Sequence, residues 1–165
     1  MYRLAKNQRG FTLLAVLVAV TLIGLSAGMA GSTWSSLVQR SREKELFWRG
    51  DQYRNAIRQY YEKGHGGVRL YPRELKNLLR DPRSLEMIRH IRQLYNDPLT
   101  GKDWELIRDP GGRIKGVRST SDKEPFRQDG FPEEYATFAG AKSYRDWKFE
   151  YKPVVAPNAV RQGKK

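Results

Sequence analysis

The chain begins with a short polar stretch followed by an uncharged apolar run. Phe11 to Ala30 is twenty residues without a charge, and its only polar side chains are two threonines and a serine. As a helix this run spans roughly 30 Å, the thickness of the hydrocarbon core of a bilayer. Lipid offers no partners for free backbone N–H and C=O groups, so a helix is the conformation that satisfies them. The pattern therefore predicts a transmembrane helix over residues 11–31.

Charge is distributed unequally around this run. Arg3, Lys6 and Arg9 precede it, and the next charged residue is Arg40. Positively charged flanks remain on the cytoplasmic side of a membrane. We therefore expect a single-pass protein with a cytoplasmic N-terminus and an exported C-terminal domain.

The next segment keeps the helical period but becomes amphipathic. It contains no proline from Ser32 to Lys63, and its large apolar residues recur in steps that define one helix face. These residues are Leu46, Phe47, Tyr53, Ile57, Tyr60 and Tyr61. Three glycines at 64, 66 and 67 then end the pattern. We predict an amphipathic continuation of the long helix over residues 32–63, with its aromatic stripe packed as core.

Short elements follow. Helical spacing predicts two short helices, Arg73–Arg80 and Arg83–Leu94. Alternation and turn residues predict three strands, at 104–108, 113–119 and 144–151, although Gly116 weakens the second.

The remaining segments are polar. Residues 120–143 have the composition of a long loop, and residues 153–165 that of a flexible basic tail. The globular α+β domain is therefore predicted at 64–152. The apolar face of its antiparallel sheet needs a cover, and the stripe of the long helix is the candidate.

Composition limits the partners and the catalytic chemistry that the chain can have. The net charge is +13 over 165 residues, which favours anionic partners without identifying one. Cysteine is absent, so disulfides and thiol chemistry are excluded. The two histidines, His65 and His90, have no suggestive serine or acidic neighbour in sequence, and no catalytic motif occurs. We predict that the protein is not an enzyme.

The 120–143 loop is a candidate calcium site. It contains oxygen ligands of the kind that calcium prefers, at Asp122, Glu124, Asp129, Glu133 and Glu134. Their spacing is not that of an EF-hand, and solvated loop charge is the favoured interpretation. We therefore predict no cofactor.

The junction of leader and apolar run has three interpretations. Gly28-Met29-Ala30 allows cleavage of a secretory signal, and an uncleaved anchor is the second possibility. The third is cleavage between Gly10 and Phe11. The basic leader, Gly10, and Phe11-Thr12-Leu13-Leu14 closely resemble the processing site of type IV prepilins and type II secretion pseudopilins.

This resemblance implies several properties. A prepilin peptidase and N-methyltransferase would remove the leader peptide, residues 1–10, and methylate Phe11. The mature subunit would sit in the bacterial inner membrane with its C-terminal domain in the periplasm. Its partners would be other pilin-like subunits and an inner-membrane assembly platform.

One position departs from the family. Members usually carry glutamate at the fifth residue of the mature chain, where this sequence has Ala15. In the family that carboxylate is thought to meet the N-terminal amine of a neighbouring subunit, and a buried amine without a partner is costly. Either the missing contact is tolerated or the subunit occupies a specialised place in the filament.

A looser resemblance lies further along. Asp97-Pro98-Leu99-Thr100-Gly101-Lys102-Asp103-Trp104 is similar to the Asp-Pro turn and aromatic strand of the major type II secretion pseudopilin. We therefore expect a structural, pseudopilin-like subunit of a type II secretion or related type IV filament machine. The alternative is a minor pilin of a type IV pilus or DNA-uptake machine whose basic exported domain binds nucleic acid.

Overall fold

The computed structural model describes residues 8–64 and 68–153, without the side chains of 8–9 and 25–33. His65, most of the leader and most of the basic tail lie outside these residues. The chain divides into two compact units, Met1–Ser41 and Arg42–Lys165, which are considered separately below.

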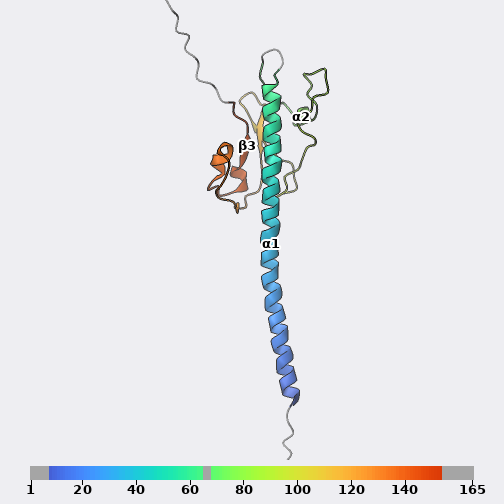
Figure 1. Cartoon of the computed structure of the whole chain (residues 1–165), viewed down its shortest axis with the longest axis vertical. Coiled ribbons are helices and arrows are strands. Elements are labelled where there is room, and N and C mark those ends of the chain that lie inside the picture. Colours follow the sequence, from blue (N-terminus) through green and yellow to red (C-terminus); the bar gives the residue numbers. More distant parts are fainter. Residues whose placement is uncertain (1–7, 65–67, 154–165) are drawn as a thin grey trace, which may run out of the picture. The chain divides into compact units, whose positions relative to one another are not determined.

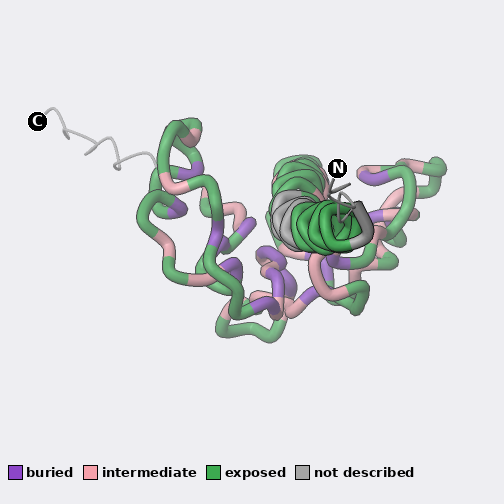
Figure 2. The backbone as a smooth tube through the Cα atoms, turned by 90° about the horizontal axis from the view of Figure 1, so that it is seen from below, coloured by how far each residue is buried: buried purple, intermediate pink, exposed green. Residues whose placement is uncertain are grey.

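Helix α1 (Gln8–Glu62) supplies the helical part of both units. In the first unit, residues 10–24 are all exposed, with large apolar side chains such as Phe11, Leu14 and Ile23 between 61 and 75 % accessible. Figure 2 shows this stretch, near the N label, uniformly green. The Thr21 hydroxyl donates to the Leu17 carbonyl, the one-turn-back bond by which a helix accommodates threonine.

The predicted membrane span is only partly covered by the described side chains. Within those side chains, no helical stretch meets the combined requirement of length and apolarity for crossing a bilayer. Residues 25–31 of the predicted span lie outside them. The 11–31 boundary therefore stays a prediction.

The second unit is an α+β domain in which α1 packs on a three-stranded antiparallel sheet, as predicted (Figure 1). The strands are β1 (Glu105–Arg108), β2 (Ile114–Arg118) and β3 (Lys148–Glu150), in the order β1-β2-β3. The turn between β1 and β2 is held by Asp109, whose carboxylate accepts the N–H of Arg113 at 2.7 Å. Gly112 in this turn has φ +74°, a conformation that favours glycine.

The buried stripe of α1 is the predicted one. Leu46, Tyr53, Ile57 and Tyr60 are at most 3 % exposed. On the sheet, Ile114, Val117 and Phe149 are fully buried against them. Tyr53 and Tyr60 of the stripe are therefore core residues, while Phe47 is partly buried against the core and Tyr61 is half-buried.

Two glycines allow the elements to approach closely. An added Cβ at Gly50 of α1 would lie 2.4 Å from the Phe149 ring. At Gly116 of β2 it would lie 2.5 Å from the Phe149 carbonyl oxygen. Gly116 is thus a requirement of the β2–β3 pairing, and the sequence-based view of it as a weakness of the strand was incomplete.

The prediction of a helix at Arg83–Leu94 was wrong. This segment has no regular structure, and Leu85 is fully exposed while Ile91 is buried. Its backbone bonds elsewhere, because the N–H groups of His90 and Ile91 donate to the Leu78 carbonyl. The preceding helix is shorter than expected, at α2 (Lys76–Leu79).

Two other boundaries also differ. The predicted 120–143 loop contains the 3₁₀ segment η1 (Glu133–Phe138), which buries Tyr135 and Phe138. The predicted 144–151 strand begins with the 3₁₀ turn η2 (Tyr144–Asp146), because Asp146 and Ser143 form a capping box. Only β3 remains as strand.

Gly50→Ala should destabilise the second unit. The substitution gains helix propensity but drives a methyl group into a fully buried ring, and overpacking of this kind costs about 1–3 kcal/mol. Urea unfolding of the full chain in detergent, followed by fluorescence of the buried Trp104 and Trp147, measures the midpoint. Gly24→Ala is the matched control, because a Cβ there meets nothing within 4 Å. Equal midpoints for Gly50→Ala and the parent chain would contradict this packing.

Candidate functional site

The predicted processing junction lies at the start of α1. Gly10 and Phe11 are in its first described turns and are exposed. An added Cβ at Gly10 would meet nothing within 4 Å. Glycine inside a helix costs about 1 kcal/mol relative to alanine. Packing within the described residues therefore does not require a glycine at this position.

Ala15 lies one helical turn further along α1 and is also exposed. The first acidic residue of the helix is Glu43, in the other unit. The described structure therefore offers no substitute carboxylate near position 15.

Glu43 binds residues of a distant segment through its carboxylate. Its carboxylate accepts the backbone N–H of Phe126 at 2.7 Å and that of Arg127 at 3.2 Å. It also accepts the Tyr144 hydroxyl at 2.7 Å. Glu43 therefore holds the 120–143 segment to one side of α1.

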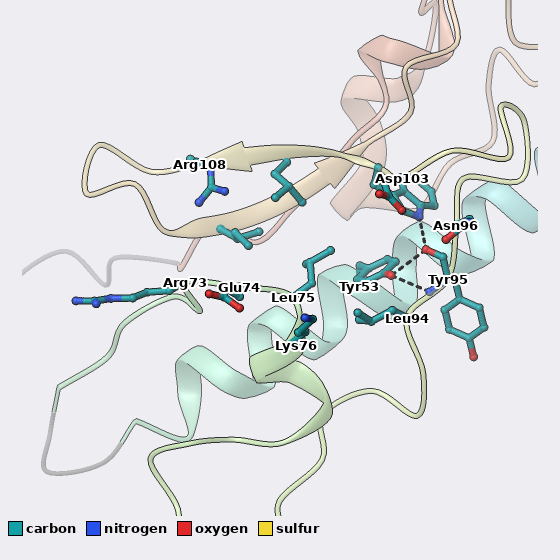
Figure 3. Close-up of a pocket in the computed structure, with 13 residues that line it drawn as sticks. Tyr53, Arg73, Glu74, Leu75, Lys76, Leu94, Tyr95, Asn96, Asp103 and Arg108 are labelled. Carbon is teal, nitrogen blue, oxygen red and sulfur yellow. Dashed lines mark hydrogen bonds between the residues drawn. The ribbon is translucent and has the colours of Figure 1, made fainter.

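A second flank of α1 is held by tyrosine and tryptophan. The Tyr53 hydroxyl donates to the Tyr95 carbonyl at 2.9 Å and accepts the Tyr95 N–H at 2.8 Å. The Trp104 indole N–H donates to the same carbonyl at 2.9 Å. Figure 3 shows these bonds beside a cavity of about 320 Å³, with Arg73, Glu74 and Arg108 around it. Leu75, Leu94, Leu106 and Ile114 are among its lining residues.

Asp97, in the Asp-Pro turn, is completely buried. Its carboxylate accepts the Leu99 N–H at 2.9 Å, the Thr100 hydroxyl at 2.9 Å and the Ser119 hydroxyl at 2.7 Å. The Gly101 N–H donates to the Asp97 carbonyl at 2.7 Å. The turn is thus tied to the end of β2 by a buried carboxylate.

His90 has no acidic neighbour in the sequence, but the fold brings Asp81 to it. Its side chain is fully buried, and Nε2 lies 3.2 Å from Oδ2 of Asp81. Sequence spacing gave no signal because the two residues are nine positions apart in an irregular segment. Arg83 also bonds Asp81, at 2.7 Å, and its guanidinium lies 3.5 Å from the centre of the Tyr60 ring. The described partners of His90 include no nucleophile.

Burial and charge set the protonation of this cluster. Burial alone would raise the pKa of Asp81, but the hydrogen bonds from Arg83 and His90 hold that pKa well below its ordinary value. Burial lowers the pKa of His90, and the hydrogen bond to Asp81 opposes this only in part. Nδ1 of His90 is buried without a partner, so a second proton on the ring would be an unsatisfied donor.

The acidic residues of the 120–143 segment are dispersed. Asp122 lies 3.5 Å from the Arg145 guanidinium, and Glu134 lies 2.6 Å from that of Arg54. Over residues 8–64 and 68–153, no three histidine or acidic side chains gather as a metal site. The prediction that no cofactor is bound stays a prediction.

The His90 cluster predicts acid sensitivity. The unfolded histidine takes up a proton below about pH 6.5, whereas the buried ring resists it, so stability falls as pH falls from that value. Asp81 adds its own loss only below its unfolded pKa of about 3.8, because its folded pKa is lower. Urea unfolding at pH 7.5 and 5.5 should differ by about 1 kcal/mol in the parent chain. His90→Gln should flatten this difference, and an unchanged pH dependence would refute the role of His90.

The N-terminal segment carries a known motif. Residues 5–31 match the family model of the prokaryotic N-terminal methylation motif. No curated protein and no solved structure gives a significant match to the chain. The match covers the junction at Gly10 and Phe11 and the first part of α1. The chain thus carries, at its N-terminus, the prepilin-type processing motif of type IV pilin-like proteins.

Proposed function

We propose that this chain is a structural subunit, similar to the pseudopilins, of a type II secretion or related type IV filament machine. Its N-terminal helix anchors it in the bacterial inner membrane before assembly, and its C-terminal domain lies in the periplasm. One observation carries the proposal: the methylation motif at residues 5–31 coincides with the start of α1 at Gln8. Cleavage after Gly10 therefore leaves nearly the whole helix in the mature subunit.

The exposed apolar surface of residues 10–24 supports this role. Every described side chain in that stretch is exposed, and nothing within the described chain covers it. A helix that is apolar all round is normally buried in protein or lipid. Lipid before assembly and neighbouring helices afterwards would both cover it, through van der Waals packing in which Gly24 allows close approach.

The polar clusters support a structural role rather than catalysis. The buried carboxylates of Glu43, Asp81 and Asp97 accept hydrogen bonds from neighbouring backbone and side-chain groups. The proposal requires no cofactor, and motion of the filament would come from a separate motor.

Ala15 fits a subunit whose partner does not depend on a carboxylate at this position. The amine of mature Phe11 would then meet solvent, lipid headgroups or an acidic residue of a different subunit.

The mature protein should begin with N-methylated Phe11. Mass spectrometry of the N-terminal peptide of protein purified from membranes tests this directly. Gly10→Val should leave most of the protein with Met1–Gly10 attached, because the branched side chain obstructs the peptidase. Gly24→Val, in the same helix, should be processed normally. Cleavage after Ala30, or unchanged processing of Gly10→Val, would overturn the proposal.

A second candidate is a minor pilin that binds nucleic acid. The specific observation in its favour is an exposed arginine group, Arg80, Arg89 and Arg92, with the half-exposed Trp48 nearby. Binding through phosphate contacts predicts affinity that falls steeply with salt. A gel-shift titration of the full chain in detergent with single-stranded DNA measures this. A flat salt response or no shift near physiological ionic strength would exclude this candidate.

A further inference from the structure

The segment that follows α2 presents unpaired positive charge. Arg80, Arg89 and Arg92 are exposed and have no ion pair within the described residues. Their neighbour Arg83 differs, because it is bound to Asp81. Arg80, Arg89 and Arg92 are here called the arginine surface.

Two adjoining hollows form this surface. One, of about 390 Å³, is lined by Leu79, Arg80, Met87, Arg89 and Arg92. The other, of about 640 Å³, shares Arg89 and Arg92 and reaches Trp48 and Tyr95. Neither hollow has an acidic lining residue.

Large apolar side chains stand within and beside the arginines. Met87 is 67 % exposed and lines the first hollow, while Trp48 is 51 % exposed and lines the second. Leu85, in the same segment, is fully exposed. Arginine, methionine and tryptophan are the residue types enriched in protein interfaces, so this surface has the composition of a contact with another protein.

The same chain carries a complementary surface. Residues 122–134 hold five carboxylates and only two cations, in a chain that is otherwise strongly basic. Asp122, Asp129, Glu133 and Glu134 are exposed, and Phe126 is 41 % exposed among them. Asp122 and Glu134 are already bound to Arg145 and Arg54, so Asp129 and Glu133 are the carboxylates here for which the described residues show no ion pair. We call residues 122–134 the acidic surface.

The two surfaces lie on different flanks of α1. Trp48 and Arg49 face the 90–96 segment, where the Trp48 and Tyr95 rings are 5.4 Å apart and Arg49 donates to the Asn96 carbonyl. Glu43 and Arg54 face the acidic surface. At about 100° per residue these two pairs point to different sides of the helix. Figure 1 shows α2 and the green segment after it on one side, and the orange segment with η1 on the other.

We propose that the arginine surface receives the acidic surface of a second copy of this chain. The proposal rests on the assembly role argued above and names the lateral contact through which it occurs. The two surfaces are different patches on one protomer, so the contact is heterologous and propagates from copy to copy. Such a contact suits a filament, because each added subunit presents the same two surfaces again.

A cysteine-free chain allows a site-specific test. Gln93→Cys and Ala136→Cys place thiols on exposed, uncharged positions beside the two surfaces. Treating membranes that contain this full-length double variant with a short bismaleimide should give a ladder of multimers. Either single variant should give dimers at most. A lysine-reactive crosslinker, applied in parallel, reports assembly without regard to which surfaces meet.

Charge reversal identifies the interaction. In the double-cysteine background, Arg80→Glu with Arg92→Glu should reduce the ladder about tenfold, because like charges then face each other. Adding Asp129→Arg and Glu133→Arg should restore it. Lys148→Glu, an exposed position on β3 outside both surfaces, should leave the ladder unchanged.

The outcomes separate the two proposals. A lysine-linked ladder without a cysteine-linked one would overturn the lateral contact and leave the assembly role intact. Absence of both ladders would overturn the assembly role and the contact with it. Failure of the fourfold reversal to restore the ladder would assign the arginine surface to another anionic partner, such as nucleic acid or lipid, and would overturn the contact.

Discussion

The fold of the second unit depends on how closely Phe149 approaches two glycines. Its ring is completely buried and reaches α1 at Gly50, while its backbone, paired with Val117 of β2, lies against Gly116. Phe47 and Phe138 surround the ring, with centroids 6.0 and 5.1 Å away. A side chain at Gly50 would separate the helix from the sheet, and one at Gly116 would separate β2 from β3. Well-packed cores relax little. The contact between Gly50 and Phe149 therefore sets the distance between α1 and the sheet, and the loops that connect them must span that distance.

Buried carboxylates then fix the loops, since little regular structure is available to do so. Glu43 binds the backbone of the segment before η1, Asp97 holds the turn before β1, and Asp81 orders the irregular segment after α2. In each case an acidic group that would be costly to bury alone is matched by N–H or O–H donors. The chain has no cysteine, so these hydrogen bonds hold the loops without any disulfide.

The periodicity of apolar residues predicted those elements that bury one face and expose the other. The stripe from Leu46 to Tyr60 and the alternation of Trp147 and Phe149 each follow from burial on one side, and both are confirmed. The prediction of a helix at Arg83–Leu94 was wrong because hydrogen bonds to residues outside the segment outweigh its apolar spacing. Asp81 binds His90, and the backbone N–H groups of His90 and Ile91 bond the Leu78 carbonyl. The η2 turn was missed for a related reason, as Tyr144 is held by Glu43, about a hundred positions earlier.

The processing motif was predictable because it is read from contiguous residues and needs no tertiary context. The contacts on the flanks of α1 were not predictable, since residues 48 and 54 become neighbours of segments far along the chain only after the helix docks.

The sheet covers one stripe of α1, which leaves the two flanks free to carry opposite charge. On one flank the arginines keep their charge unpaired, because the nearby carboxylate of Asp81 is already engaged by Arg83 and His90. On the other, Glu43 and Arg54 hold an acidic segment in place. The same hydrogen bonds that order the loops therefore also keep the arginines and the acidic segment apart, on the surface of a chain whose overall net charge is +13.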